Sequence, residues 1–448
     1  MEKTFICLLI TLLFLSCSSH ETAVMQGDTD TFRNATVVIS DIHMGDSRAC
    51  GYTNQKVYGW LSENKKELVI FLNSVKSTNW IKELVIAGDL IDQWVAPVNV
   101  RVWGDNTDDN ESIFLDSVRH ANTDIVNAFV QIKNAGIEIH YTPGNHDMSI
   151  NQDKLDRLFG KNTIICENEN DAKGLGFYNT QNNLVRIEHG HRLDFFNAPD
   201  SISNIDTNEN SIIPLGFIVS KIASSSDMNK SRGFLNCDTG PKWFDALYRD
   251  YDLYLAAWKL ILYNKPNSID TNDWEKKIIQ TGNLINHEQT FSYSDIIPTF
   301  WGNFNDRRTI YKNTYKTSEW NARQEINNVP VKLSIREALL TGVFPSYFDD
   351  TAIAEYLQVQ GCSQKVLVMG HTHSPALKKV KTPDGDKIYV NSGSWVDKKW
   401  LDKKTPTKTF VVIKNNDIDK TCCVELFEFN NSIKTSALLG SANIDDIE

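Results

Sequence analysis

The chain has 448 residues, of which 41% are hydrophobic and 23% are charged. This composition excludes an intrinsically disordered protein and is that of a globular one. The formal net charge of −11 argues against a partner that is a nucleic-acid polymer, because binding one needs a basic surface. An anionic small substrate is compatible with this charge, since bound cations reverse the local field of a site.

The first residues have the pattern of an export signal. Lys3 precedes an apolar run from Phe5 to Leu15, which is too short to span a bilayer. The run ends in Leu-Phe-Leu-Ser-Cys, which resembles a bacterial lipobox with Cys17 as the lipidated residue. We therefore expect residues 1–16 to be a signal peptide and residues 17–33 the spacer of an exported lipoprotein. Its lipid would anchor it in a membrane, facing the periplasm or the cell surface; secretion without a lipid is the alternative.

Five short apolar runs, rich in β-branched residues, each end in a polar motif. They are Ala35–Ser40, Glu83–Ala87, Ile137–Tyr141, Leu184–Glu188 and Val366–Met369. Runs of this length predict buried strands. Helix-like stretches separate the first three runs, at Lys65–Thr78 and Ser112–Ala135, and this order indicates βαβ units. Because ligands bind beyond the carboxyl ends of the strands in such sheets, we expect the polar motifs to meet in one site.

Residues 197–363 have a different sequence pattern from the rest of the chain. Aromatic stretches with helical spacing predict a mostly helical insertion that caps the site, at Trp243–Tyr263, Trp274–His287 and Ile335–Thr341. Strand-like runs return after the insertion, so we expect residues 34–196 and 364–430 to form one α/β (α+β) domain. Residues 431–448 are polar, and a loose tail is expected there.

The polar motifs contain six of the ten histidines, which a random scatter of structural histidines explains poorly. A single Asp-x-His or Gly-Asp pair is more often a turn or a helix cap, so the combination carries the prediction. Hydrolysis of a phosphate ester favours two divalent ions about 3.5–4 Å apart, which stabilise the attacking and leaving oxygens. Imidazole ligands suit Mn, Fe or Zn, whereas Mg and Ca sites use mainly oxygen.

These motifs, in this order, resemble those of the calcineurin-like metallophosphoesterase superfamily. They are Asp41-x-His43, Gly88-Asp89, Gly144-Asn145-His146-Asp147, His189-Gly190-His191 and Gly370-His371-Thr372-His373. The resemblance implies a four-layer β-sandwich flanked by helices. It also implies two divalent ions, with Mn²⁺ expected first and Fe or Zn as alternatives. The first ion would be bound by Asp41, His43 and His373. The second would be bound by Asn145, His189 and His371, and Asp89 would bridge the two.

Within this resemblance, His146 is the predicted general acid, and Asp147 beside it would orient the imidazole and raise its pKa. A hydrogen-bonding role behind the ligands is the alternative for His146. A second alternative concerns His191, which would be a phosphate contact, a supporting group, or the ligand in place of His189. By resemblance, the first histidine of this pair is the ligand.

The stretches Gly88–Trp94 and His189–Asp194 are similar to those of UDP-2,3-diacylglucosamine pyrophosphohydrolases. This chain departs from that branch at His146, where the branch carries arginine. The predicted function is therefore an exported phosphohydrolase with two metal ions and a metal-activated water. Its substrate would be a phosphate ester or pyrophosphate, carried by a small molecule or a lipid. The alternative is a surface-binding lipoprotein that contains metal without turning over a substrate.

Overall fold

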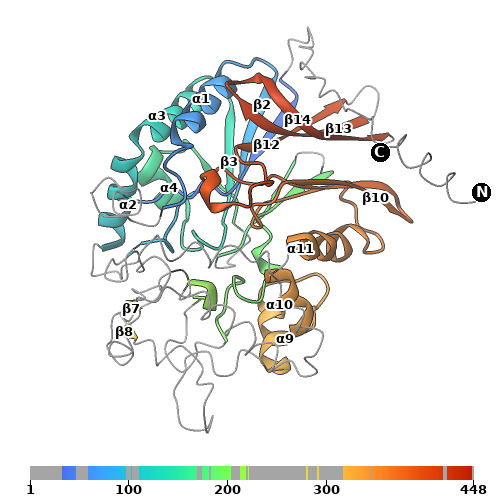
Figure 1. Ribbon diagram of the computed structural model, residues 1–448. Helices are drawn as coiled ribbons and strands as arrows, with labels where there is room; N and C mark the ends of the chain where they lie inside the picture. Colours follow the sequence, from blue (N-terminus) through green and yellow to red (C-terminus); the bar gives the residue numbers. More distant parts are fainter. Residues whose placement is uncertain are drawn as a thin grey trace, which may run out of the picture.

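Two β-sheets pack face to face, and helices cover the outer face of each (Figure 1). The computed structural model describes residues 33–46, 59–96, 102, 110–168, 174–180, 183–202, 212–217, 220, 279–280, 290–291, 316–343, 345–416 and 421–445. Within these residues the layers follow the order helix, sheet, sheet, helix. The predicted four-layer sandwich is confirmed.

The first sheet has seven strands and combines a parallel half with an antiparallel half. Its strands, in spatial order, are β14 (Ser432–Asp445), β13 (Thr421–Asn430), β12 (Thr409–Asn416), β1 (Ala35–Ile39), β2 (Ile81–Ala87), β3 (Glu138–Thr142) and β4 (Ile165–Cys166). Strands β1 to β4 run parallel, and β12 to β14 are antiparallel to their neighbours.

Helices connect the parallel strands, as the predicted βαβ units require. Helix α1 (Lys65–Lys76) joins β1 to β2, and α2 (Asn110–Ala121) and α3 (Thr123–Asn134) join β2 to β3. The single helix expected over Ser112–Ala135 is therefore two, because the chain breaks at buried Asn122. The side-chain amide of Asn122 donates to the carbonyls of Gly45 and Val118. Helix α4 (Gln152–Phe159) completes this layer by packing against α2 and α3.

The second sheet has five strands and brings two of the polar motifs together. Its strands, in spatial order, are β10 (Ala376–Thr382), β11 (Gly385–Asn391), β9 (Val366–Met369), β6 (Val185–Ile187) and β5 (Tyr178–Asn179). Strands β6 and β9 are parallel neighbours, with Ile187 paired to Val368. The motifs that follow these two strands, nearly 200 residues apart in sequence, therefore start side by side.

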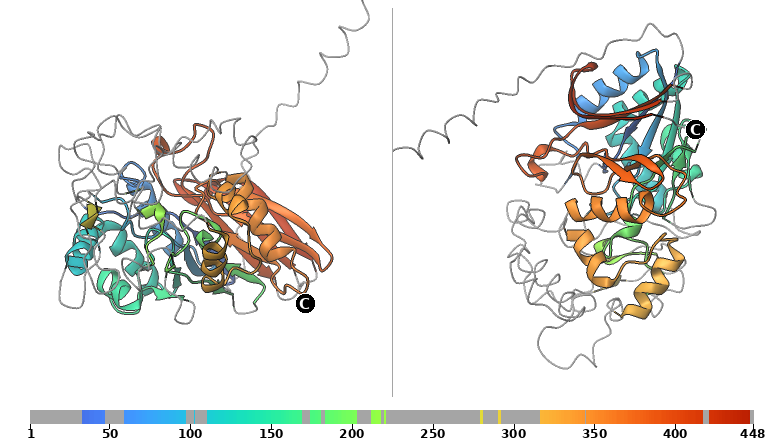
Figure 2. Two further views of the ribbon diagram at one scale, coloured as in Figure 1. Left: turned by 90° about the horizontal axis from the view of Figure 1, so that it is seen from below. Right: turned by 90° about the vertical axis from the view of Figure 1, so that its right-hand side faces the viewer.

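Helix α11 (Pro345–Ala352) and the π-helical turn η4 (Ile353–Leu357) cover the outer face of this second sheet, and both views of Figure 2 show these orange helices beside it. The Tyr389 hydroxyl of β11 donates to Asp349 of α11. This end of the predicted insertion thus forms the fourth layer of the sandwich.

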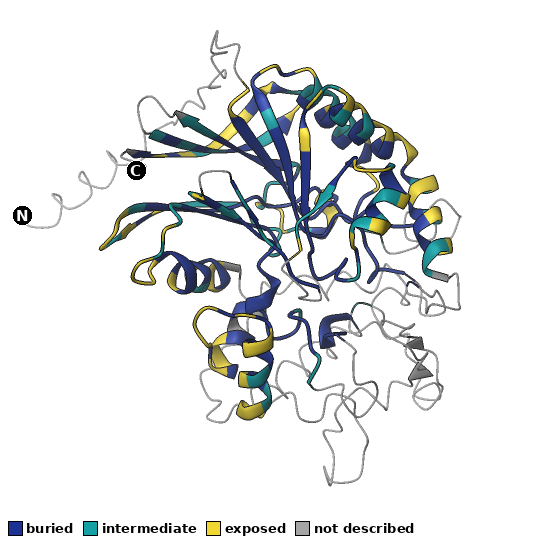
Figure 3. Cartoon of the chain, turned by 180° about the vertical axis from the view of Figure 1, so that it is seen from behind, coloured by how far each residue is buried: buried dark blue, intermediate teal, exposed yellow. Residues whose placement is uncertain are grey.

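The strands alternate strictly between two apolar environments. Val38, Val85 and Val368 face the layer between the sheets. Their neighbours Val37 and Leu84 point the other way, toward α1 and α3. Because successive side chains of a strand leave opposite faces, strands that are apolar at every position must be covered twice. Figure 3 shows the result, with the central strands buried along their length.

The polar tail predicted for residues 431–448 is wrong for residues 432–445. They form β14, which pairs antiparallel with β13 after a turn at Asn431, whose φ is 61°. Ile433 and Ile444 are buried on the sheet, while polar residues such as Lys434, Thr435 and Asn443 are exposed between them. The many polar residues of this edge strand hid its alternation, because only one row of its side chains has to be apolar.

This strand gives a stability prediction. Replacing Ile444 by alanine should lower the free energy of unfolding by about 2–5 kcal/mol, because a side chain only 2% exposed leaves a cavity. Leu439→Ala on the same strand is the matched control, since Leu439 is 41% exposed. Chemical denaturation of both variants checks the difference, and equal midpoints would contradict the packing of β14.

The described part of the insertion contains both helices and strands. Helix α10 (Ile335–Val343) confirms the helix expected over Ile335–Thr341. Helix α9 (Thr317–Ile326) was not predicted, and its Arg323 donates to the carbonyls of Phe195 and Pro199. Strands β7 (Ile279–Gln280) and β8 (Thr290–Phe291) pair antiparallel, so the helix expected over Trp274–His287 is wrong at Ile279–Gln280. Ladder hydrogen bonds there favour the extended chain. The helix predicted for Trp243–Tyr263 lies outside the described residues.

Candidate metal centre

All seven predicted metal ligands follow the carboxyl ends of five strands. In the first sheet, β1, β2 and β3 lead into the motifs of Asp41, Asp89 and Asn145. In the second sheet, β6 leads into His189 and β9 into His371. The two sheets therefore present their strand ends to one place, which short loops can reach.

Five of these ligands adopt the left-handed backbone conformation that side chains other than glycine rarely take. Their φ angles lie between 52° and 72°, at Asp41, His43, Asp89, His371 and His373. Each such residue costs roughly 1–3 kcal/mol and persists only where its surroundings enforce it. The conformation turns the chain sharply after the strand.

Glycines precede the ligands because a neighbouring ligand occupies the space of a side chain. A Cβ at Gly144 would lie 2.1 Å from Asp89 Oδ1, and a Cβ at Gly88 would lie 2.5 Å from the His189 ring. Each Gly-ligand pair thus packs against the ligand of another motif. This explains in physical terms why Gly-Asp and Gly-Asn recur in the sequence.

Asp41, His43 and His373 form the first group of donor atoms. His373 Nε2 lies 3.1 Å from Asp41 Oδ1 and 3.1 Å from His43 Nε2. Asp41 Oδ1 is buried and accepts no hydrogen bond from the described residues. A buried carboxylate oxygen without a hydrogen bond is costly unless a cation satisfies it. These donors therefore fit a divalent metal ion, and the three residues can hold one.

Asn145, His189 and His371 form the second group. Asn145 Oδ1 lies 3.0 Å from His189 Nε2 and 3.0 Å from His371 Nδ1. Asp89 lies between the groups, with Oδ2 3.3 Å from His189 Nε2 and 3.5 Å from His43 Nε2. The atoms of Asp89 thus reach one histidine of each group, which is the position that a bridging carboxylate needs.

The remaining ring nitrogens of three histidines are held from behind. His189 Nδ1 lies 2.8 Å from the Ala87 carbonyl, and His371 Nε2 lies 2.9 Å from Asp194 Oδ2. His43 Nδ1 faces Asp92 Oδ2 at 3.5 Å. Such contacts fix the tautomer, so that the other nitrogen offers its lone pair to the centre. Sequence reasoning missed Asp92 and Asp194, whose only signal was their place within three residues of a motif.

The comparison with protein families agrees with this geometry. The model of the calcineurin-like phosphoesterase family matches residues 35–375, which include every one of these motifs. The chain belongs to this family. A search of curated proteins gave no match. Membership suggests hydrolysis of a phosphoric ester at a divalent metal site, for which the two groups of this phosphoesterase provide the donors.

The imidazole of His146 in this phosphoesterase is oriented by Asp92, so the prediction that Asp147 orients it is wrong, although the charge of Asp147 does contribute to the raised pKa of His146. His146 Nδ1 lies 2.9 Å from Asp92 Oδ1. The carboxylate of Asp147 instead accepts from the backbone N–H groups of Leu90, Ile91 and Gly144. Adjacent residues on a tight turn point in different directions, so Asp147 holds the two loops together.

His189, and not His191, lies with the donor atoms. His191 Nε2 lies 2.7 Å from the carbonyl of Gly174, and His191 is in none of the groups of donor atoms that could hold an ion among the described residues. Burial, followed by the charge of His189, lowers the pKa of His191 well below its ordinary value. The two histidines are separated by Gly190, whose φ of 105° turns the chain between them.

Charges within the centre are strongly coupled. Burial opposes ionisation of Asp89, but His189 and His146 outweigh it and hold the pKa of Asp89 well below its usual range. Burial likewise opposes the charged form of His189, yet Asp89 and Asp41 raise the pKa of His189 to about 10. Without metal, protons bound at His189 therefore offset part of the negative charge of Asp89 and Asp41. Metal binding has to release them, because a histidine ligand must be neutral.

Two tryptophans wall the centre. The Trp60 ring lies 5.3 Å from those of His43 and His373, and Trp94 stacks on His146 at 4.5 Å. Both indoles are largely buried. Large apolar groups at this position exclude water and strengthen the electrostatic interactions inside.

Proposed function

We propose that this phosphoesterase is an exported hydrolase that cleaves a phosphate ester or a pyrophosphate at a centre for two divalent ions. The observation that carries the proposal is the convergence of seven donor side chains, in which the buried Asp41 Oδ1 has another predicted ligand, His373 Nε2, at 3.1 Å. A protein without a bound cation gains nothing from this arrangement, since burying such an oxygen costs free energy.

Each group of donors would hold one ion. Asp41, His43 and His373 would bind the first, and Asn145, His189 and His371 the second, with Asp89 between them. Nitrogen donors outnumber carboxylates, which favours Mn²⁺, Fe or Zn over Mg²⁺ or Ca²⁺. Bound ions would supply Lewis-acid polarisation of the phosphoryl group and a water nucleophile at neutral pH.

His146 is proposed as the general acid. Asp92 holds its Nδ1, so Nε2 is the nitrogen that would give a proton to the departing oxygen. Burial opposes the protonated ring, but Asp92 and Asp89 more than offset this and raise the pKa of His146. The imidazole is therefore kept as a proton donor, and the stacked Trp94 restricts its motion.

A phosphate-release screen tests the function. Mature protein is stripped with a chelator and reloaded with Mn²⁺, Zn²⁺ or Fe²⁺. It is then offered phosphate monoesters, diesters and pyrophosphates of nucleotides, sugars and lipid head groups. Metal-dependent release from one class supports the proposal. Bound metal with no release from any class would favour the alternative, a binding lipoprotein.

Membrane attachment through Cys17 is part of the same proposal, and it is supported by the sequence pattern of residues 1–19 alone. Within the described residues, no helix is long and apolar enough to cross a membrane. Cys17→Ser should move the protein from the membrane fraction to the soluble fraction of a bacterial host. Cell fractionation with an immunoblot measures this, and unchanged membrane association would contradict lipidation at Cys17.

A further inference from the structure

A second group of potential ligands lies on the first sheet, apart from the centre described above. Glu138 and His140 are two residues apart on β3, and Glu83 pairs with Glu138 from the neighbouring β2. All three side chains point to the face that packs on the second sheet. Along β2, Glu83 lies four positions before the last strand residue, Ala87, which is about 13 Å of extended chain.

The imidazole of His140 is held as a ligand would be. Its Nδ1 lies 2.8 Å from Glu167 Oε1 and donates a hydrogen bond to it. Its Nε2 is buried and has no hydrogen-bond partner in the part of the chain that the structure describes, and the side chain as a whole is only 9% exposed. A carboxylate on one ring nitrogen that leaves the other as a buried lone pair is the arrangement of metal-bound histidines.

The oxygens near this nitrogen have the spacing of a coordination shell. His140 Nε2 lies 3.7 Å from Glu138 Oε2, and an oxygen of Glu83 completes a group whose ligand atoms are all within 4.8 Å of one another. Ligands bound tetrahedrally at about 2.0–2.2 Å are separated by roughly 3.4 Å. Small side-chain movements would therefore close the group around one ion.

Both carboxylate oxygens of Glu83 accept hydrogen bonds. The hydroxyls of Thr36 and Tyr178 donate to its two oxygens, the second at 2.7 Å, so Glu83 acts as an acceptor on both. The Tyr178 ring, from the second sheet, also stacks on His140 at 4.3 Å. With Glu138 and Glu167, three carboxylates surround one imidazole. A divalent ion would offset this concentration of negative charge.

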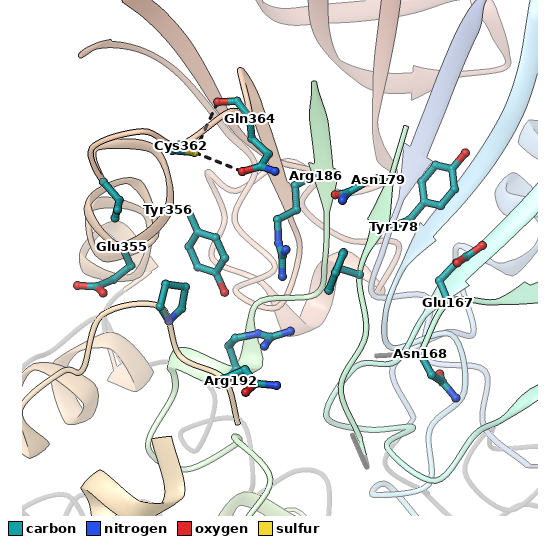
Figure 4. Close-up of a pocket in the computed structure, with 14 residues that line it drawn as sticks. Glu167, Asn168, Tyr178, Asn179, Arg186, Arg192, Glu355, Tyr356, Cys362 and Gln364 are labelled. Carbon is teal, nitrogen blue, oxygen red and sulfur yellow. Dashed lines mark hydrogen bonds between the residues drawn. The ribbon is translucent and has the colours of Figure 1, made fainter. Parts of the chain in front are cut away.

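Two neighbours of the group line an open cavity, although Glu83, Glu138 and His140 do not line it themselves. Glu167 and Tyr178 lie on one side of this cavity, whose volume is about 790 Å³ (Figure 4). Two arginines line the same cavity, but Glu188 pairs with both Arg186 and Arg192. Their charge is thereby offset locally. The side chain of Glu138 is 55% exposed, so an ion can reach the group from the surface there.

We propose that Glu83, Glu138 and His140 form a further metal site, which takes one divalent ion of the zinc type. One nitrogen and two carboxylate oxygens are a ligand set that zinc accepts, with water in the remaining position. The ion would link β2 to β3 and, through Tyr178, the first sheet to the second. This role is structural, and it does not depend on hydrolysis at the centre of Asp89.

Zinc content per chain tests the proposal. Full-length mature protein is equilibrated with Zn²⁺, dialysed and measured by elemental analysis. Glu138→Gln should lose one ion per chain and keep its rate of hydrolysis, because Glu138 is 55% exposed and its replacement leaves the core intact. Glu325→Gln is the matched control, an exposed glutamate on α9, and should keep the wild-type content.

A second background separates this site from the proposed active centre. Asp89→Asn should bind less zinc than wild type yet keep the ion of this site, and adding Glu138→Gln should lower the content by one further ion per chain. Zinc should also raise the melting temperature of Asp89→Asn more than that of the double variant. Equal zinc content in wild type and Glu138→Gln would overturn the proposal, because His140 would then serve only in ion pairs. Failure of hydrolysis in wild type would affect the proposed function and not this result.

Discussion

Asp89→Asn is expected to reduce metal-dependent phosphate release by about 10³-fold or more, a loss of at least ~4 kcal/mol of transition-state stabilisation. The reason is its position, with Oδ2 3.5 Å from His43 Nε2 and 3.3 Å from His189 Nε2. An amide has the same shape but removes one of only two carboxylates among the predicted ligands. The two ions would then repel each other with less compensation, and at least one should be lost.

The substitution is conservative for the fold. Asp89 Oδ1 accepts from the backbone N–H of His146 at 2.8 Å, and the amide oxygen of asparagine can accept the same bond. Asp349→Asn is the control, a buried aspartate that binds Tyr389 on the outer side of the second sheet. Initial rates and elemental analysis of both variants give the comparison. Full activity of Asp89→Asn would refute a centre with two ions bridged by this carboxylate.

His146→Gln is expected to lower kcat by about 10²–10⁴-fold on an alkyl phosphate, the usual contribution of general acid catalysis. On an aryl phosphate with a weakly basic leaving group, the loss should be much smaller, since that oxygen departs without a proton. Metal content should stay at the wild-type level if His146 serves as the acid, with its Nδ1 bound to Asp92. Because a ring atom of His146 also lies within ligand distance of His43 and Asp89, elemental analysis of the variant tests whether the ring binds an ion instead.

The dependence of the rate on the leaving group distinguishes a catalytic role of His146 from a structural one. A purely structural role would reduce both rates equally and would also change metal content or KM. Asp92→Asn serves as a companion variant, since it keeps the shape but weakens the hydrogen bond that orients His146. It should show the same preference for weakly basic leaving groups, to a smaller degree. The opposite order of the two variants would contradict the assignment of His146 as the acid.

Local patterns predicted the central strands well, whereas the sandwich and the ligand assignments came from the resemblance to a family. Strands β1, β2, β3 and β9 stand within two residues of their apolar runs, because a strand covered on both faces is apolar at every position. The edge strand β14 was not predicted, because many of its side chains face solvent and its sequence is therefore not continuously apolar. The short strands β7 and β8 were also not predicted, because their extended form depends on pairing between the two strands rather than on the composition of either.

Contacts between distant segments decided what the residue types left open. The choice between His189 and His191 depends on the Gly174 carbonyl, and the partner of His146 is Asp92, more than fifty residues earlier in the chain. Asp194 likewise reaches His371 only because β6 and β9 are neighbours. Which side chains carry metal chemistry follows from residue type and strand ends, which are local. Which atoms meet is a matter of distance in the folded chain, and sequence spacing does not contain it.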